Sequence, residues 1–279
     1  MRSLTFKTLS VLAIAVFLIS CENEQIDNTD PDQNIKDQMV LDYLTGRTSS
    51  DCHFEYEGSS GPDNWFSLCN GAWSDCGGNV QSPINIVTNS TLEDDSINNI
   101  NTNYAKSSTD IFNNGHTIQF NYNSGSYASL GNIDYNLLQF HFHTGSEHTV
   151  DGLRYPMEMH LVHQDPTTGL LAVVGIFFTE GRENEALAQF MDHLPENEDD
   201  HYTSSEEYDI KDILPDELDF YTYNGSLTTP PCSEIVSWYV VKAPVEASHE
   251  QLERFEHIMH ENFRPVQILD GRTVRTNDD

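Results

Sequence analysis

Hydrophobic and polar residues alternate with a period of two in the middle of the chain, over residues 138–143. Successive side chains of a β-strand point to opposite faces, so this run predicts a strand with one polar and one apolar face. The polar face carries Gln139, His141 and His143. Taken alone, His-x-His on a strand is better explained by an ordinary half-buried pair than by a metal site.

A second run, residues 157–163, repeats the alternation. It places Glu158, His160 and Val162 on one face, so His163 faces the other way. If the two strands are neighbours, His141, His143 and His160 converge, and three neutral imidazoles are a common zinc ligand set that leaves one coordination position open. Gln139 and Glu158, each two residues before a histidine, are placed to fix a second ring nitrogen.

Other segments predict further sheet and two helices. β-prone pieces occur at 84–87 and 117–122, and the nearly continuous apolar run 170–178 is typical of a strand buried on both faces in mid-sheet. Helical spacing predicts one helix over about 183–194 and another after Ser248, where Ser248 and Gln251 can form a capping box. The acidic segment 195–219 between them is interpreted as a solvated excursion, and no repeat or second domain boundary is apparent.

Composition changes this picture mainly through charge. The chain has 279 residues, and its hydrophobic content of 37% is enough for a substantial core. Its net charge is -32, with only 13 Lys and Arg. Phosphate contacts need clustered basic residues, so nucleic acid and anionic membrane surfaces are not expected partners.

The first residues resemble an export signal. Residues 1–20 carry Arg2 and Lys7 ahead of an apolar run that is too short to span a membrane. The sequence ending in Cys21 resembles a bacterial lipobox, which implies cleavage before Cys21 and lipid attachment to its sulfur; an ordinary cleavable signal is the alternative. We therefore expect a signal peptide (1–20), a lipidated polar tether (21–50) and one catalytic domain (51–279). This chain is then exported to the cell envelope, in the periplasm or on the outer surface, and contacts the membrane only through its lipid anchor.

Four further cysteines favour disulfides in an exported protein. They are Cys52, Cys69, Cys76 and Cys232. Three connectivities are open, of which we favour Cys76 with Cys232 and Cys52 with Cys69, and free buried thiols are the alternative.

Several separated motifs stand out along the chain. They are Gln139–His143 followed by Gly145–Val150, Gln81–Ile86, Asn113–His116, Gly225–Cys232 and Asn262–Pro265. Together these motifs resemble the alpha-class carbonic anhydrases. The matches extend over roughly residues 52 to 275. The resemblance implies a mainly β single domain, built on a large, twisted, mostly antiparallel central sheet with peripheral helices and a conical pocket. The strand pattern agrees with this fold but cannot fix its topology.

The resemblance also implies roles for individual residues. His141, His143 and His160 look like the ligands of Zn²⁺; Gln139, Glu158 and the backbone of Asn262 look like the partners of His141, His160 and His143. Thr228 resembles a gatekeeper that donates a hydrogen bond to Glu147 and orients a zinc-bound hydroxide, because an ionised carboxylate can only accept. His116 matches the proton shuttle, a task that suits imidazole because its ordinary pKa is near neutrality. The residues matching the substrate pocket are Val162, Val173, Leu227, Thr228, Thr229, Val236 and Trp238.

The implied activity is the reversible hydration of carbon dioxide to bicarbonate and a proton. Zinc-bound hydroxide attacks carbon dioxide, and a histidine passes the surplus proton to solvent. One alternative is a catalytically silent surface protein that uses the same fold for binding. Another is a zinc hydrolase of peptides or esters, which the lack of a His-Glu-x-x-His motif disfavours. The sequence leaves the oligomeric state open, a homodimer included.

Overall fold

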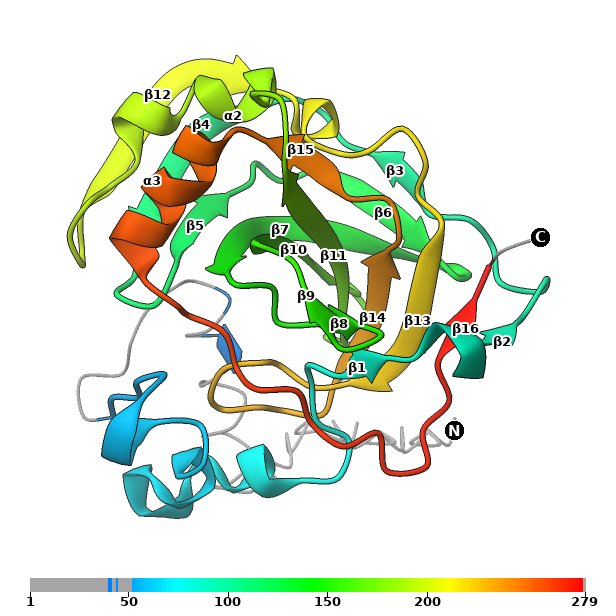
Figure 1. Ribbon diagram of the computed structural model, residues 1–279. Coiled ribbons are helices and arrows are strands. Elements are labelled where there is room, and N and C mark those ends of the chain that lie inside the picture. The colour runs from blue at the N-terminus through cyan, green and yellow to red at the C-terminus, as the bar shows by residue number, and fades with distance from the viewer. Residues whose placement is uncertain (1–39, 42–43, 45–51, 278–279) are drawn as a thin grey trace, which may run out of the picture.

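A large curved sheet forms the body of the molecule (Figure 1). The computed structural model describes residues 40–41, 44 and 52–277. The sheet has 13 strands, ten of which follow the order β12-β4-β5-β7-β10-β11-β14-β13-β16-β2, while β15 pairs with β11 and β6 joins β3 to β7. Most neighbours are antiparallel, but β14 and β15 run parallel to β11, and β2 runs parallel to β16. The predicted fold class, mainly β with a twisted and mostly antiparallel sheet, is confirmed.

The strands of the main sheet differ widely in length. They are β2 (Leu92–Glu93), β3 (Asn101–Asn103), β4 (Ser107–Asn113), β5 (Ile118–Asn121), β6 (Tyr127–Leu130), β7 (Ile133–Thr144), β10 (Met157–Gln164), β11 (Leu171–Glu180), β12 (His201–Tyr208), β13 (Phe220–Gly225), β14 (Val236–Val241), β15 (Val245–Ala247) and β16 (Arg275–Thr276). A small second sheet contains β1 (Asn85–Ile86), β8 (Thr149–Val150) and β9 (Leu153–Arg154).

Helices are few and short among the described residues. The α-helices are α2 (Glu185–Ala188) and α3 (His249–Met259), and the 3₁₀ turns are Gly58–Ser60, Trp65–Ser67, Cys69–Gly71, Ser74–Gly77, Thr88–Ser90, Met191–His193 and Ile210–Asp212. The predicted capping box is confirmed at the start of α3: the Ser248 hydroxyl accepts from the Gln251 backbone, and the Gln251 side chain accepts from Ser248.

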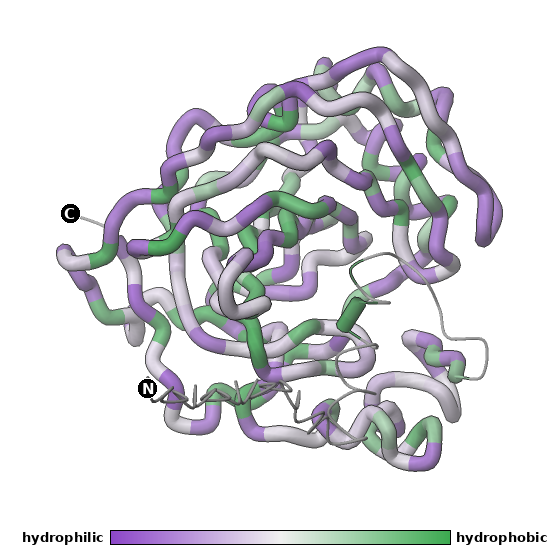
Figure 2. The backbone as a smooth tube through the Cα atoms, turned by 180° about the vertical axis from the view of Figure 1, so that it is seen from behind, coloured by the Kyte–Doolittle hydropathy of each residue, from purple (hydrophilic) through white to green (hydrophobic). Residues whose placement is uncertain are grey.

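The central strands β10 and β11 are buried on both faces. Figure 2 colours the backbone by hydropathy, and hydrophobic segments appear in green within the body of the molecule. On one face, Phe140 and Phe142 of β7 belong to the large core cluster, and the Phe142 ring lies 4.6 Å from that of Phe255 on α3. On the other face, Val162 and Val173 belong to a second apolar cluster. The histidines of β7 share this second face, because alternate side chains of a strand point the same way.

A third apolar cluster lies in the segment before the sheet, around Phe54, Trp65 and Trp73. Two disulfides lie in this cluster, Cys52–Cys69 and Cys76–Cys232. Both are the pairs that the sequence analysis favoured. The longer one closes 156 residues and ties the start of the domain to the loop before β14.

The continuous helix predicted over 183–194 is wrong. The structure has only α2 and the turn Met191–His193 there. Leu187, Phe190 and Leu194 are nevertheless buried, so the periodicity identified the inward-facing residues correctly. So short a helix has few internal hydrogen bonds, and tertiary packing holds it in place.

The interpretation of segment 195–219 as a solvated excursion is also wrong. It contains β12, which pairs antiparallel with β4 at the edge of the main sheet, and its residues Tyr208, Ile210 and Ile213 are buried. The acidic side chains of β12 are exposed. Charged side chains on an edge strand oppose pairing with other chains, which explains an acidic strand at this position.

Several predictions lie outside the described residues: the signal peptide 1–20, the tether 21–50 apart from three of its residues, and Cys21. Within the part of the chain that the structure describes, no helix is long and apolar enough to cross a membrane.

His163 gives the fold a testable pH dependence. Its ring is fully buried, with Nδ1 donating to the Leu161 carbonyl (3.0 Å) and Nε2 accepting from the Tyr104 hydroxyl (2.8 Å). Burial lowers the pKa of His163 from 6.5 to about 4. Between these values the unfolded chain binds a proton that the folded chain does not, so the free energy of unfolding falls as pH falls, by up to about 3 kcal/mol at pH 4.

We expect denaturant titrations from pH 8 to 4 to show a shallower loss of stability in His163→Gln than in the wild type, whatever the variant's stability at pH 8. If the free energy of unfolding of His163→Gln falls with pH as steeply as that of the wild type, the pH dependence does not come from His163.

Candidate metal centre

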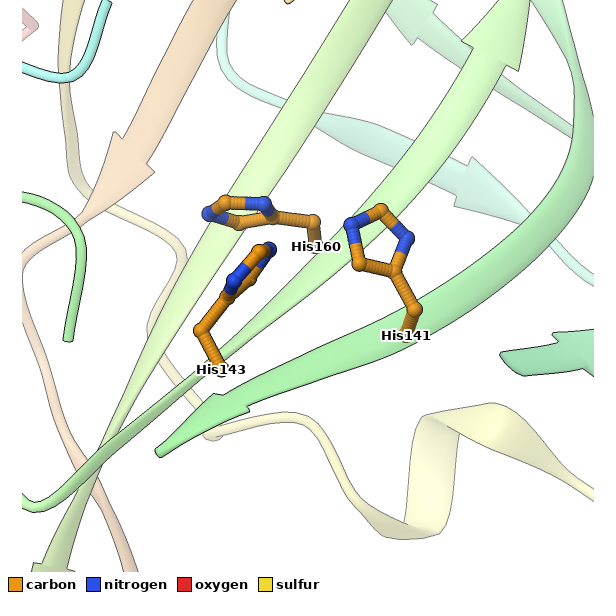
Figure 3. A group of neighbouring side chains, drawn as sticks. All are labelled: His141, His143 and His160. Atoms are coloured by element: carbon orange, nitrogen blue, oxygen red, sulfur yellow. The ribbon is translucent and has the colours of Figure 1, made fainter. Parts of the chain in front are cut away.

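Strands β7 and β10 bring three histidines together. The strands are antiparallel neighbours, with His160 opposite His141 and Glu158 opposite His143. This confirms the pairing on which the sequence prediction depended. Figure 3 shows the three rings turned toward one another from the two strands.

The three rings form a compact group. Their centroids lie 5.1 Å apart for His141 and His143, 5.3 Å for His141 and His160, and 4.6 Å for His143 and His160. One ring nitrogen of each lies within 4.8 Å of the others, and each residue is at most 4% exposed. A single ion can therefore be reached by all three.

The second nitrogen of each ring is held by a neighbour. His141 Nδ1 lies 2.9 Å from Gln139 Oε1, and His143 Nδ1 lies 2.7 Å from the Asn262 carbonyl. His160 Nε2 lies 2.9 Å from Glu158 Oε1. All three acceptors fix the ring N–H on the far side, so a lone pair on the remaining nitrogen of each ring faces the centre of the group.

This arrangement fits a zinc ion. His143 Nε2 is buried without a hydrogen-bond partner among the described residues, which is costly unless a ligand takes it up. Burial, together with the neighbouring histidines, lowers the pKa of His141 well below its ordinary value, and burial also lowers the pKa of His143. Both rings are therefore neutral at physiological pH, the form that binds metal.

A second group of potential ligands contains His148, Glu158 and His160. His148 Nδ1 lies 2.8 Å from Glu158 Oε1, and the His148 backbone donates to Glu158 Oε2 at 2.9 Å. These groups already satisfy one another by hydrogen bonds, so the three-histidine group is the better metal site. Burial alone would raise the pKa of Glu158, but His148 and His160 outweigh it and hold that pKa well below its usual value.

Glu147 also faces the histidines. Its Oε1 accepts from the Arg264 backbone at 2.8 Å, while Oε2 lies 3.5 Å from His143 Nε2 and 3.9 Å from His160 Nδ1. Thr228 is buried, but the structure shows no hydrogen bond between its hydroxyl and Glu147, whose Oε2 has no hydrogen-bond partner among the described residues. The Thr228–Glu147 hydrogen bond implied by the resemblance is therefore absent here.

His116 lies in the turn between β4 and β5, and its backbone is linked to the metal centre through Asn262. Its carbonyl accepts from the side chain of Asn262, the residue whose own carbonyl holds His143. The His116 ring stacks on Phe54, with centroids 3.8 Å apart. Burial, and secondarily His53, lowers the pKa of His116 from 6.5 to about 4. The near-neutral pKa expected of a proton shuttle is therefore not what this position has.

The residues predicted to line the substrate pocket lie together beside the histidines. Val162, Val173, Leu227, Val236 and Trp238 belong to one apolar cluster, and each is at most 3% exposed. The Trp238 ring lies 4.8 Å from that of His160. Thr229 is half-buried next to Thr228.

Sequence reasoning missed two supporting features of the site. It assigned no role to His148, whose backbone N–H and ring Nδ1 contact the two carboxylate oxygens of Glu158 and whose Nε2 lies 2.7 Å from the Tyr223 hydroxyl. It used only the backbone of Asn262, whose side chain also accepts from the backbone of Thr144 at 2.8 Å. No spacing rule connects these residues, because the contacts arise from tertiary packing.

Comparison with known proteins identifies the family. A model described as eukaryotic-type carbonic anhydrase matches residues 60–278. This chain therefore belongs to the alpha-carbonic anhydrase family.

Bacterial carbonic anhydrases resemble the chain over most of its length. A carbonic anhydrase of Pectobacterium atrosepticum is 38% identical over 243 residues, which cover 85% of this chain and 96% of the relative. One from Nostoc sp. is 41% identical, covering 78% of this chain and 84% of the relative. The solved alpha-carbonic anhydrase of Thermovibrio ammonificans, in complex with the inhibitor sulfanilamide, superposes with a TM-score of 0.78 at 40% identity and covers 81% of this chain and 100% of that one.

Gly175 provides a test of how the carbonic anhydrase site is supported. It lies opposite His160 on β11, and a Cβ atom there would come within 2.9 Å of Glu158 Oε1. Gly175→Ala should displace that carboxylate from His160 and weaken zinc binding by roughly 10- to 100-fold, the usual effect of losing such a partner. Chelator competition measures this.

Val174→Ala, in the same strand but on the opposite face, is the matched control: it should lose stability and keep its zinc affinity. Equal zinc affinities for Gly175→Ala and the wild type would contradict the supporting role of Glu158.

Proposed function

We propose that this chain catalyses the reversible hydration of carbon dioxide to bicarbonate and a proton, with zinc held by His141, His143 and His160. One observation carries the proposal: in a member of the alpha-carbonic anhydrase family, three buried histidines converge and each has its second nitrogen fixed. Zinc is a Lewis acid that, when bound, supplies an activated water as nucleophile at neutral pH, chemistry for which carbonic anhydrase is itself the standard example.

The protein's own groups would hold the reactants in place. The apolar cluster of Val162, Val173, Leu227, Val236 and Trp238 offers an uncharged surface beside the histidines, which suits an uncharged substrate such as carbon dioxide. Burial excludes bulk water from the histidines, so their lone pairs stay available to the metal.

Glu147 and Thr228 are the residues that we assign to orienting the nucleophile. Glu147 is a fully buried acceptor whose Oε2 has no hydrogen-bond partner within the described part of the chain, and Thr228 is a buried hydroxyl. Since the two share no hydrogen bond in the structure, this assignment is supported by the family resemblance and by their burial.

The alternatives predict different measurements. A silent surface-binding protein would lack hydration activity even with zinc bound, and a zinc hydrolase would cleave peptides or esters in preference to hydrating carbon dioxide. The three intact histidines favour an active hydratase, because a silent protein has no need of a metal ligand set with its supporting residues.

His143→Ala tests the proposed function. The wild type should contain about one zinc per chain and hydrate carbon dioxide, since three imidazoles and an open position are the usual catalytic zinc site. The variant should lose most of its zinc and fall to the uncatalysed hydration rate. Metal analysis and stopped-flow pH-indicator assays measure both.

His201→Ala is the matched control, because His201 is a partly exposed histidine on the edge strand β12, where it pairs with Asp110. A zinc-loaded wild type without hydration activity would contradict the proposal, as would a His143→Ala protein at the wild-type rate.

We also propose that the chain is exported and anchored by lipid at Cys21. The support is the sequence alone, namely the basic and apolar residues of 1–20 and the lipobox-like sequence before Cys21. One acyl chain gives only weak membrane binding, so stable anchoring requires more than one lipid chain on this residue.

In detergent phase separation of bacterial cell extracts, the full-length chain should partition into the detergent phase and the Cys21→Ala variant into the aqueous phase. Partition of both proteins into the same phase would contradict lipid anchoring at Cys21.

A further inference from the structure

The segment that precedes the sheet carries an exposed histidine next to His116. The rings of His53 and His116 lie 5.6 Å apart between centroids. Phe54, the residue after His53, stacks on the His116 ring and is itself buried. His53 is 60% exposed by side chain, whereas the His116 ring is largely shielded by this stack.

This segment is held firmly in place. The Cys52–Cys69 disulfide fixes the residue before His53, and the Trp65 indole donates to the Glu55 carbonyl at 3.0 Å. The chain is therefore held on both sides of His53, by the disulfide at Cys52 and by the hydrogen bond at Glu55.

His53 has a carboxylate partner. Its Nε2 lies 2.5 Å from Glu55 Oε1, and the Glu55 side chain is 58% exposed. A doubly protonated His53 ring would form an ion pair with Glu55 while staying open to water and buffer. Another acidic side chain near this turn, Glu198, lies over Gly115.

His116 holds a proton only weakly, so a proton that it receives passes on readily to a nearby base. Burial, and then the nearby His53, lowers the pKa of His116 to about 4, so the ring does not keep a proton near neutral pH. A proton that reaches His116 needs a neighbouring acceptor, and the His53 ring is within the range of one bridging water.

We propose that His53, paired with Glu55, is the outer proton carrier of the reaction and delivers to solvent the proton that His116 receives. An N–H bond breaks at His116 as one forms at His53, and a second transfer passes the proton from His53 to water or a buffer base. This inference rests on the proposed function, because hydration of carbon dioxide supplies the proton.

His53→Ala in the full-length, zinc-loaded protein tests the inference. Proton release follows formation of bicarbonate, so its loss should lower kcat at low buffer concentration and leave kcat/KM near the wild-type value. We expect kcat to fall by about ten-fold, less than the 10²–10⁴-fold typical of positioned acid–base groups, because water also carries protons. Concentrated imidazole buffer should restore kcat, which it would not do for a folding defect.

Three further variants sharpen the test. Glu55→Gln should lower kcat at low buffer in the same way but less, since it removes only the partner of His53. In the double variant His53→Ala/His116→Ala, kcat should match that of His116→Ala, because residues in one relay do not add. His201→Ala, a partly exposed histidine that also pairs with a carboxylate, should behave as the wild type.

The outcomes separate this inference from the proposed function. A His53→Ala protein with wild-type kcat at low buffer overturns the role of His53, even if the wild type is fully active. A wild type that hydrates no carbon dioxide at any buffer concentration overturns the proposed function and this inference with it.

Discussion

The antiparallel register between β7 and β10 is the constraint on which the rest of the structure depends. It places His160 opposite His141 and Glu158 opposite His143, so all three histidines reach one point. A shift of one residue would turn the histidines of one strand to the opposite face, where Phe140 and Phe142 now pack in the large core. The same alternation that buries the phenylalanines therefore fixes the candidate metal site.

Burying a polar group is costly unless it has a hydrogen-bond partner. Glu158 shows how this is achieved, because its carboxylate accepts hydrogen bonds from His160 and His148. The other ring nitrogen of His148 lies 2.7 Å from the Tyr223 hydroxyl, which in turn donates to Ser82 Oγ at 2.9 Å. A carboxylate in this position would otherwise be strongly destabilised by burial. The network holds His160 rigidly, and a ring held in this way is organised for a metal before the metal binds.

Residue pattern predicted the parts of the site that depend on strand periodicity. The alternation in β7 and β10 predicted that His141 and His143 share one face and that His163 points to the opposite face. The continuous apolar run predicted the central place of β11. Local chemistry likewise gave the capping box at Ser248. The strand order could not be obtained this way, because it depends on contacts between distant segments.

Other features escaped prediction for the same physical reason. The segment 195–219 reads as solvated because its charges are exposed, yet β12 is held by backbone hydrogen bonds that are independent of side-chain polarity. His148 and the side chain of Asn262 act through partners far away in the chain. The stacking of His116 on Phe54 depends on where the disulfide-linked segment folds back. The burial of His116, which lowers its pKa, depends on the same packing.

Anomalous diffraction at the zinc absorption edge, from crystals of the purified protein, tests the central claim most directly. The account predicts one strong peak about 2.0–2.1 Å from the inward nitrogens of His141, His143 and His160, the normal zinc–imidazole distance. No peak at this point after soaking in zinc, or a peak between His148 and Glu158 instead, would contradict it.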